Sequence, residues 1–292
     1  MTFVITFMIF VVKRFIDFKP IFNSSKMNSR QIIYQVDSFT KEPFKGNPAG
    51  VCILDHEPDS AWMQNVAMEM NLSETAFVFP DKDSRRIRYF TPEAEVPLCG
   101  HATLAASHIL YETNLANDNE EISLLAKLGI LKMHKSGSWI TMNFPSYHII
   151  QSAVPAEFEK VVGVKPLEYY KCNNGLTLAL VSDEKIIHNL KPDFKAMKET
   201  EFGDLAVTAV SSDKKYDFCL RFFAPSLGIN EDPVTGSAHC ALVPFWHIRT
   251  GRIDFISHQI SKRGGILKVS FKGDRVEISG QTKTIFKAEL FV

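Results

Sequence analysis

Two stretches of the sequence place small residues at the start of a predicted apolar helix. Gly100 precedes a helix expected at 102–111, and Gly236 with Ser237 precedes one expected at 238–248. Such a start leaves backbone N–H groups without partners at the positive end of the helix dipole, where a carboxylate or phosphate binds well. A single start of this type is usually only a helix cap. Two with the same pattern predict an anion-binding cleft shared by both helix ends.

A candidate acid–base residue is Glu74, which lies between a predicted amphipathic helix and an apolar strand at 75–79. Asp59 or Ser60 can cap that helix, and Asn71 suits its left-handed end. A carboxylate held between two apolar elements loses water, which raises its pKa and suits it to general acid–base catalysis. An ordinary surface turn is the alternative that the local sequence leaves open.

Three further side chains near the helix starts can do chemistry. His101 can carry a proton near neutral pH or serve only in a helix cap. Asp232 can orient a substrate amine or cap the second helix. An internal repeat of the sequence makes Glu95 the counterpart of Asp232. Cys99 precedes the first helix, where the dipole favours a thiolate, although most buried cysteines only pack.

The sequence repeats itself around these residues. An arginine in an aromatic strand that ends at proline is followed by an acidic residue, a glycine and an apolar helix, first from Arg88 and again from Arg221. The offset is 133 residues at the arginines and 136 at the glycines, so the second copy has a longer loop. Self-similarity of this kind decides the architecture of a chain. It predicts two homologous halves with a boundary near 144–146.

Short strands outnumber helices, and the two central helices are apolar on nearly every face. A surface helix keeps a polar face, so a sheet must surround each of these helices. The predicted fold class is therefore α+β, with two pseudo-symmetric halves that each curl a mixed, barrel-like sheet around one apolar helix. The predicted domains are an appended segment at 1–26, a first half at 27–144 and a second half at 145–282.

The composition excludes several classes of protein. The chain has 292 residues with 33 basic and 33 acidic side chains, so it lacks the long-range field that attracts nucleic acid or an anionic membrane. Five cysteines without CxxC pairs argue against a disulfide framework and a structural zinc site. We expect no metal, no nucleic acid and no membrane partner, and a reducing, cytoplasmic location.

The N-terminal segment differs from the rest of the chain. Residues 3–12 form an apolar run, but a membrane-spanning helix needs about 20 such residues. A basic pair follows this run instead of preceding it, which is a poor match to a signal peptide. We expect residues 1–26 to be appended to the folded unit.

Four ordered motifs resemble the phenazine-biosynthesis PhzF-like family. They are FKGNPAG at 44–50, MNLSETAF at 70–77, YFTP with CGHAT at 89–103, and FAP with EDPVTGSAH at 223–239. The resemblance covers residues 30–292 and implies a diaminopimelate-epimerase-like fold. In that fold the active site lies between the two halves, and the last strand, at about 283–292 here, crosses back into the first half. A homodimer is a further expectation from the resemblance.

The resemblance also implies a mechanism. In the family's isomerase type, a glutamate matching Glu74 removes and returns a proton on one face of a small cyclic amino acid, and no cofactor is needed. Positions matching His101 and Asp232 are then catalytic with Glu74. The residues assigned to substrate binding are Asn47, Cys99, Gly100, Gly236 and Ser237.

Related epimerases use a cysteine before each helix start, one on each face of the substrate carbon. Here Cys99 fits the first position, but Thr235 occupies the second, and a hydroxyl is a far weaker acid than a thiol. The residues favour a PhzF-like isomerase that acts on a small carboxylate-bearing, amino-acid-like substrate. A non-catalytic binding or interaction protein and a two-base epimerase stay open as alternatives.

Deleting residues 1–26 is expected to leave the thermal unfolding midpoint nearly unchanged, because a terminal segment with few contacts is dispensable. Thermal denaturation of the full and the shortened chain, followed by circular dichroism, measures this. A fall of many degrees in the shortened chain would show instead that residues 3–12 pack into the core.

Overall fold

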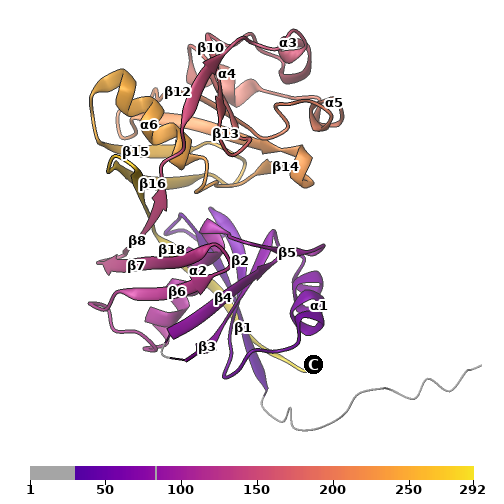
Figure 1. The fold of residues 1–292 in the computed structure, drawn as a ribbon, viewed down its shortest axis with the longest axis vertical. Coiled ribbons are helices and arrows are strands. Elements are labelled where there is room, and N and C mark those ends of the chain that lie inside the picture. Colours follow the sequence, from indigo (N-terminus) through magenta and orange to yellow (C-terminus); the bar gives the residue numbers. More distant parts are fainter. Residues whose placement is uncertain (1–29, 83) are drawn as a thin grey trace, which may run out of the picture. The chain divides into compact units, whose positions relative to one another are not determined.

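The computed structural model describes residues 30–82 and 84–292 (Figure 1). The expectation for residues 1–26 lies outside the described residues. Residues Gln31–Val292 form one unit by their contacts. None of the helices in the described part of the chain is long and apolar enough to cross a membrane.

Two sets of strands and helices follow each other along the chain. We call β1–β8 with α1 and α2 the first repeat, and β9–β17 with α3–α6 the second repeat. The first repeat consists of β1 Gln31–Ser38, β2 Asn47–Ile53, α1 Ser60–Met70, β3 Glu74–Asp81, β4 Ser84–Phe90, β5 Glu95–Val96, α2 Gly100–Glu112, β6 Ile122–Ala126, β7 Gly129–Ser136 and β8 Trp139–Pro145.

The second repeat begins directly after β8. It consists of β9 Ile149–Ser152, α3 Phe158–Val162, β10 Glu168–Cys172, β11 Thr177–Leu180, α4 Glu184–Asn189, α5 Phe194–Lys198, β12 Leu205–Val210, β13 Phe218–Ala224, a 3-10 turn Pro225–Leu227, β14 Ile229–Asp232, α6 His239–Thr250, β15 Asp254–Gln259, β16 Gly265–Phe271 and β17 Arg275–Gly280. One more strand, β18 Thr282–Leu290, follows it.

The two repeats pair their strands in the same order and the same directions. In the first repeat β1–β2 is antiparallel, β2–β3 parallel, β3–β4 antiparallel, β4–β6 parallel, and β6–β7–β8 antiparallel. The series β10–β11–β12–β13–β15–β16–β17 repeats this pattern strand for strand. The prediction of a duplicated α+β fold is therefore confirmed.

The C-terminal strand belongs to the sheet of the first repeat. β18 pairs antiparallel with β1, as β9 pairs antiparallel with β10, so each repeat has the same outer strand (Figure 1). β8 and β17 also pair with each other and make one continuous sheet of the two repeats. The domain boundaries given above stay a prediction.

A buried helix fills the inside of each repeat. α2 buries every residue from His101 to Ser107, and α6 buries every residue from His239 to Trp246. α2 packs on β1, β2, β3 and β8, while α6 packs on β16 and β17 (Figure 1). Because each helix is buried on nearly every side, neither helix shows the polar stripe of a surface helix.

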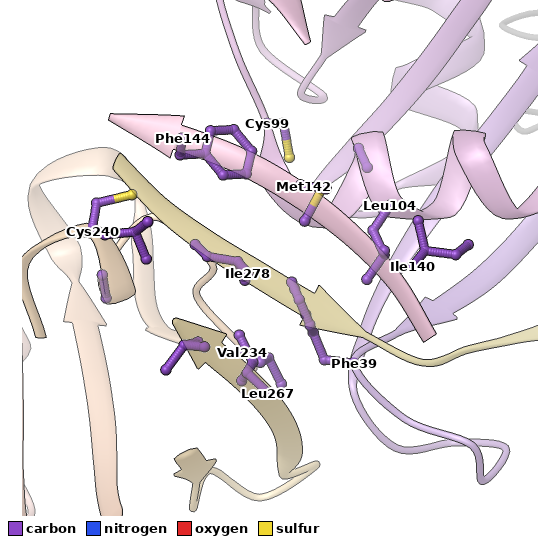
Figure 2. Close-up of a cluster of buried hydrophobic side chains, with 14 of the residues drawn as sticks. Phe39, Cys99, Leu104, Ile140, Met142, Phe144, Val234, Cys240, Leu267 and Ile278 are labelled. Carbon is purple, nitrogen blue, oxygen red and sulfur yellow. The ribbon is translucent and has the colours of Figure 1, made fainter. Parts of the chain in front are cut away.

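Phe39 lies at the junction of the two repeats. Its side chain is fully buried, and Figure 2 shows it among Val234, Leu267 and Ile278 of the second repeat. A Cβ on Gly280 would lie 2.5 Å from the Phe39 ring and 2.6 Å from a methyl group of Leu104. The aromatic ring therefore fits only because position 280 carries no side chain.

Gly280→Ala is expected to lower the free energy of unfolding by about 1–3 kcal/mol, because the added methyl group overpacks a closed junction. Chemical denaturation measures the effect. Gly100→Ala is the matched control, since its new Cβ would meet only the tip of Phe144 at 4.0 Å. Equal midpoints for Gly280→Ala and wild type would contradict this description of the junction.

Candidate active site

Glu74 is placed by the end of one helix and the start of one strand. Asp59 caps α1 by accepting a hydrogen bond from the backbone N–H of Ala61 at 2.8 Å, and Asn71 ends the helix in the left-handed conformation with φ 49°. Glu74 then opens β3, opposite Ala49 of β2. Its side chain is only 15% exposed, so the surface-turn alternative does not describe it.

Glu74, His101 and Cys99 form one cluster in the first repeat. Glu74 Oε2 lies 3.2 Å from His101 Nε2, and Cys99 Sγ lies 3.4 Å from His101 Nδ1. The first contact is not a hydrogen bond, so Glu74 Oε2 is buried without a hydrogen-bond partner among the described residues. A buried, unpaired carboxylate oxygen is costly in a folded protein and points to a functional role.

The environment changes the protonation of all three groups. Burial raises the pKa of Glu74 to about 7, and the charge of Asp232 raises it as well, while a hydrogen bond with Cys99 opposes the rise. Burial lowers the pKa of His101 to about 4 and raises the pKa of the Cys99 thiol well above its ordinary range. Near neutral pH the cluster therefore holds a half-protonated carboxyl group, a neutral imidazole and a thiol.

Asp232 brings a second carboxyl group from the other repeat. Asn47 Nδ2 donates to Asp232 Oδ1 at 2.8 Å and to the carbonyl of Val234 at 2.9 Å, and Thr235 Oγ1 donates to Asp232 Oδ2 at 2.5 Å. Burial raises the pKa of Asp232 to about 6, although the hydrogen bonds from Thr235 and Asn47 lower it. Asp232 is thus mostly ionised at neutral pH.

Asn47 links Asp232 to His101, the neighbour of Glu74. It opens β2 in the first repeat, is fully buried, and its Nδ2 also lies 3.3 Å from His101 Nδ1. The two N–H bonds to Asp232 and Val234 fix the amide, since a flipped amide would oppose oxygen to oxygen. Its Oδ1 is then left without a hydrogen-bond partner in the described structure.

The loop before Asn47 is held by Arg263 of the second repeat. Arg263 donates to Asp37 Oδ1 at 2.7 Å, to the carbonyl of Lys45 at 2.8 Å and to that of Gly46 at 2.7 Å. The N–H of Gly46 donates to the carbonyl of Gly264 at 2.8 Å. Four hydrogen bonds across the junction therefore fix the position from which Asn47 reaches Asp232.

The two helix starts differ from each other. α2 begins at Gly100 with Cys99 as its N-cap, and the thiol makes no capping hydrogen bond. α6 begins at His239, so the predicted start at 238 was one residue early, and Gly236 and Ser237 lie in the preceding turn. Gly236 is buried and Ser237 is exposed.

An arginine–glutamate pair occurs at the same place in both repeats. Arg88 holds Glu95 with two hydrogen bonds of 2.8 and 2.7 Å, and Arg221 holds Glu231 with two of 2.7 and 2.8 Å. Glu95 is therefore the counterpart of Glu231. The expectation that Glu95 corresponds to Asp232 was wrong by one residue.

The counterpart of Asp232 is an apolar residue. Tyr89 pairs with Val96 in the β4–β5 hairpin, and the matching Phe222 pairs with Asp232 in the β13–β14 hairpin. Alternate residues of a strand point to opposite faces. Glu231 therefore faces outward in the ion pair, whereas Asp232, one residue later, faces inward to the site. Only the second repeat contributes a carboxylate at this position.

The structure brings Glu74, His101, Cys99, Asn47 and Asp232 together through the contacts given above. Two residues that sequence reasoning had not assigned to the site also belong to this network, namely Thr235 and Gln259. Thr235 had been considered only as the missing thiol. Gln259 is a polar residue on the inner face of an alternating strand, which is the signal that sequence reading can use for such a residue.

Three of these side chains can offer ligand atoms to a cation. The ligand atoms of Glu74, Cys99 and His101 all lie within 4.8 Å of one another. Metal binding by cysteine requires the thiolate, whereas burial keeps the Cys99 thiol protonated here. As described, the cluster is better suited to moving protons.

Comparisons with known proteins agree with the fold. Residues 36–288 match the family model described as "Phenazine biosynthesis-like protein". An uncharacterized isomerase of Halalkalibacterium halodurans is 45% identical over 261 residues, covering 89% of this chain and 98% of its own. A phenazine biosynthesis-like domain-containing protein of Homo sapiens is 34% identical, with 88% and 98% covered.

Solved structures show the same architecture. The crystal structure of a phenazine biosynthesis protein of the PhzF family from Enterococcus faecalis has a TM-score of 0.86 at 37% identity, and covers 90% of this chain and 100% of its own. A hydroxyproline epimerase from Agrobacterium vitis, at 12% identity and a TM-score of 0.61, shares the fold. The relatives named isomerases support an isomerase as the class of enzyme. The chain belongs to the phenazine biosynthesis-like (PhzC–PhzF) family.

Proposed function

We propose that this protein is a cofactor-independent isomerase that moves a proton on a small carboxylate-bearing, amino-acid-like substrate, with Glu74 as the acid–base residue. The observation that carries the proposal is the state of Glu74. Its carboxyl group is buried where the two repeats meet, and burial raises its pKa to about 7. A group with such a pKa can accept a proton and give it back at neutral pH.

The proposed step needs no redox partner. Ionised Glu74 takes a proton from a carbon next to an electron-withdrawing group, and the electron pair of the broken C–H bond delocalises over the substrate. Protonated Glu74 then returns the proton to a carbon on the same face, so that substrate and product are isomers. Neutral His101, 3.2 Å from Glu74, can donate or accept a hydrogen bond without adding charge.

The charges around the site support an amino-acid-like substrate. Ionised Asp232 attracts an ammonium group, and the unpartnered Asn47 Oδ1 can accept an N–H from it. Backbone N–H groups at the start of α2 and in the turn at Gly236 and Ser237 suit a carboxylate. We assign these residues to substrate binding as part of the proposal.

A two-base epimerase is disfavoured by the position of Thr235. Its hydroxyl group donates to Asp232 Oδ2 at 2.5 Å, and the Nε2 group of Gln259 lies 3.2 Å from Thr235 Oγ1. A hydroxyl already engaged in this way is a poor second base opposite Cys99. The proposal therefore places proton transfer on one face, at Glu74.

The cellular setting stays part of the proposal. A cytoplasmic location, a homodimer, and the absence of nucleic-acid and membrane partners rest on the composition and the family resemblance. None of them enters the chemistry of the site.

Glu74→Gln is expected to lower turnover by about 10²–10⁴-fold with little change in substrate affinity, because the amide keeps the shape but cannot carry the proton. Incorporation of solvent deuterium, screened over small cyclic and amino acids, measures proton transfer directly. Glu121→Gln serves as the matched control, since Glu121 is exposed and its one ion pair within residues 30–82 and 84–292 is with Lys132. This control should keep full activity.

Cys99→Ala separates the carboxylate mechanism from the thiol mechanism in the same assay. We expect it to be far milder than Glu74→Gln. Loss of exchange in Cys99→Ala with exchange retained in Glu74→Gln would replace the proposal by an epimerase-like mechanism. Ligands that bind the wild type but never exchange a proton would favour a non-catalytic binding protein.

The pH dependence follows from the same groups. Because Glu74 must start as a carboxylate, kcat/KM of the wild type is expected to fall about tenfold per pH unit below pH 7. The fall should steepen below about pH 6, where Asp232 also takes up a proton. Steady-state rates between pH 5 and 9 test this, and a flat profile across that range contradicts it.

A further inference from the structure

A row of polar side chains begins on the inner face of β15 and continues just beyond the end of this strand. Ser257, Gln259 and Ser261 are spaced two residues apart, as residues on one face of an extended chain are. Ser257 and Gln259 are fully buried. Every member hydrogen-bonds to the segment 232–239, which contains Asp232 and leads into α6. We call these three residues the polar ladder.

Gln259 uses its whole amide on this segment. Its Oε1 accepts from the backbone N–H of Thr235 at 2.8 Å, and its Nε2 donates to the carbonyl of Asp232 at 2.8 Å and to Thr235 Oγ1 at 3.2 Å. Donors and acceptor are matched in only one orientation, because a flipped amide would set oxygen against the Asp232 carbonyl. Gln259 thus holds both ends of the segment 232–235.

This arrangement also sets the direction of a proton. Thr235 Oγ1 receives an N–H from Gln259, so its own proton is free to point at Asp232 Oδ2, 2.5 Å away. Asp232 Oδ1 receives its hydrogen bond from Asn47. Both carboxylate oxygens of Asp232 are therefore held in place. Asn47 of the first repeat holds Oδ1 directly, and Gln259 holds Oδ2 through Thr235.

The two serines of the ladder support the same segment. Burial lowers the pKa of His239 to about 4, so its imidazole is neutral and has one proton. His239 Nδ1 lies 2.9 Å from the carbonyl of Thr235, which can only accept, so Nδ1 donates and Nε2 accepts from Ser257 at 2.8 Å. Ser261 donates to the carbonyl of Pro233 at 2.6 Å.

The first repeat folds without such a ladder. The strand matching β15 is β6, and by the shared pairing register Leu124 matches Ser257 while Ala126 matches Gln259. Both counterparts are buried apolar residues. The fold therefore does not require polar residues here, and they occur in the repeat that supplies the carboxylate Asp232.

We propose that Gln259, supported by Ser257 and Ser261, is a positioning residue that holds Asp232 in the orientation needed for the substrate. This inference rests on the function proposed for the site, in which Asp232 receives the substrate ammonium. Gln259 itself has no contact with substrate in this account. It acts through Asp232 and Thr235, as residues behind a catalytic group commonly do.

Gln259→Leu removes all three hydrogen bonds with little change in size. We expect kcat/KM to fall about 10–100-fold, mainly through a higher KM, because a misplaced binding group weakens substrate contact. Glu74→Gln should instead lower kcat with little change in KM, so the two variants affect different kinetic constants. Gln259→Glu, which keeps the acceptor for Thr235 but loses both donors, should show the same direction of change.

Thr208→Val is the matched control for stability. Thr208 is fully buried in the second repeat and bonds to the carbonyl of Cys219 and to Trp246, away from Asp232. It should lose stability without a comparable loss of kcat/KM. A Gln259→Leu loss of kcat/KM no larger than that of Thr208→Val, at a temperature where both are folded, overturns the proposal.

A second readout does not depend on activity. The N–H of Thr235 loses its acceptor in Gln259→Leu, so its exchange with solvent deuterium should speed up by about tenfold or more, beyond any change in the core strand β12. Ser261→Ala gives a milder test if Gln259→Leu fails to fold. Unchanged exchange at the Thr235 N–H in Gln259→Leu would overturn the proposal that Gln259 holds this segment. If exchange at Thr235 is faster in Gln259→Leu but the wild type catalyses no proton transfer, only the proposed function is overturned.

Discussion

The hydrogen bond from Asn47 Nδ2 to Asp232 Oδ1, 2.8 Å long, is the contact on which the site depends. It crosses the junction of the two repeats and places one buried carboxyl group near another, with His101 beside the same amide. The loss of water on burial, together with the charge of nearby Asp232, raises the pKa of Glu74 to about 7. The Arg263 bonds to the preceding loop and the packing of Phe39 serve to keep this contact in place.

Duplication explains the frame of the site, and divergence explains its chemistry. Both repeats keep the arginine–glutamate pair, and in both the third residue after the helix-start glycine donates back to the carbonyl before that glycine, Thr103 to Cys99 and His239 to Thr235. The inner positions differ between repeats. One repeat supplies the thiol, the imidazole and Glu74, and the other supplies Asp232 with its supporting polar ladder, so a symmetric scaffold carries an asymmetric set of proton donors and acceptors.

The sequence was sufficient for the fold and for most members of the site, because the repeated strand–glycine–helix pattern is local. It was not sufficient to predict which residue of β14 corresponds to Glu95. A register irregularity between Phe222 and Ala224, together with the longer loop, moves the counterpart of Glu95 to Glu231. Gln259 was missed for a related reason, since its bonds reach residues more than twenty positions away. The placement of Glu74 between a helix and a strand was readable, and so was the rise of its pKa through loss of water. The further rise caused by the charge of Asp232 was not, because only folding brings Asp232 near.

The ionisation of Glu74 in the free protein tests this account most directly. A sample labelled with ¹³C at glutamate side-chain carboxyl carbons, assigned by comparison with Glu74→Gln, gives the titration of this single group by NMR. The account predicts a midpoint at about pH 7. A midpoint near the ordinary glutamate value of about 4.3 would contradict it, because Glu74 would then be a solvated carboxylate at neutral pH and the junction would not supply the environment that proton return requires.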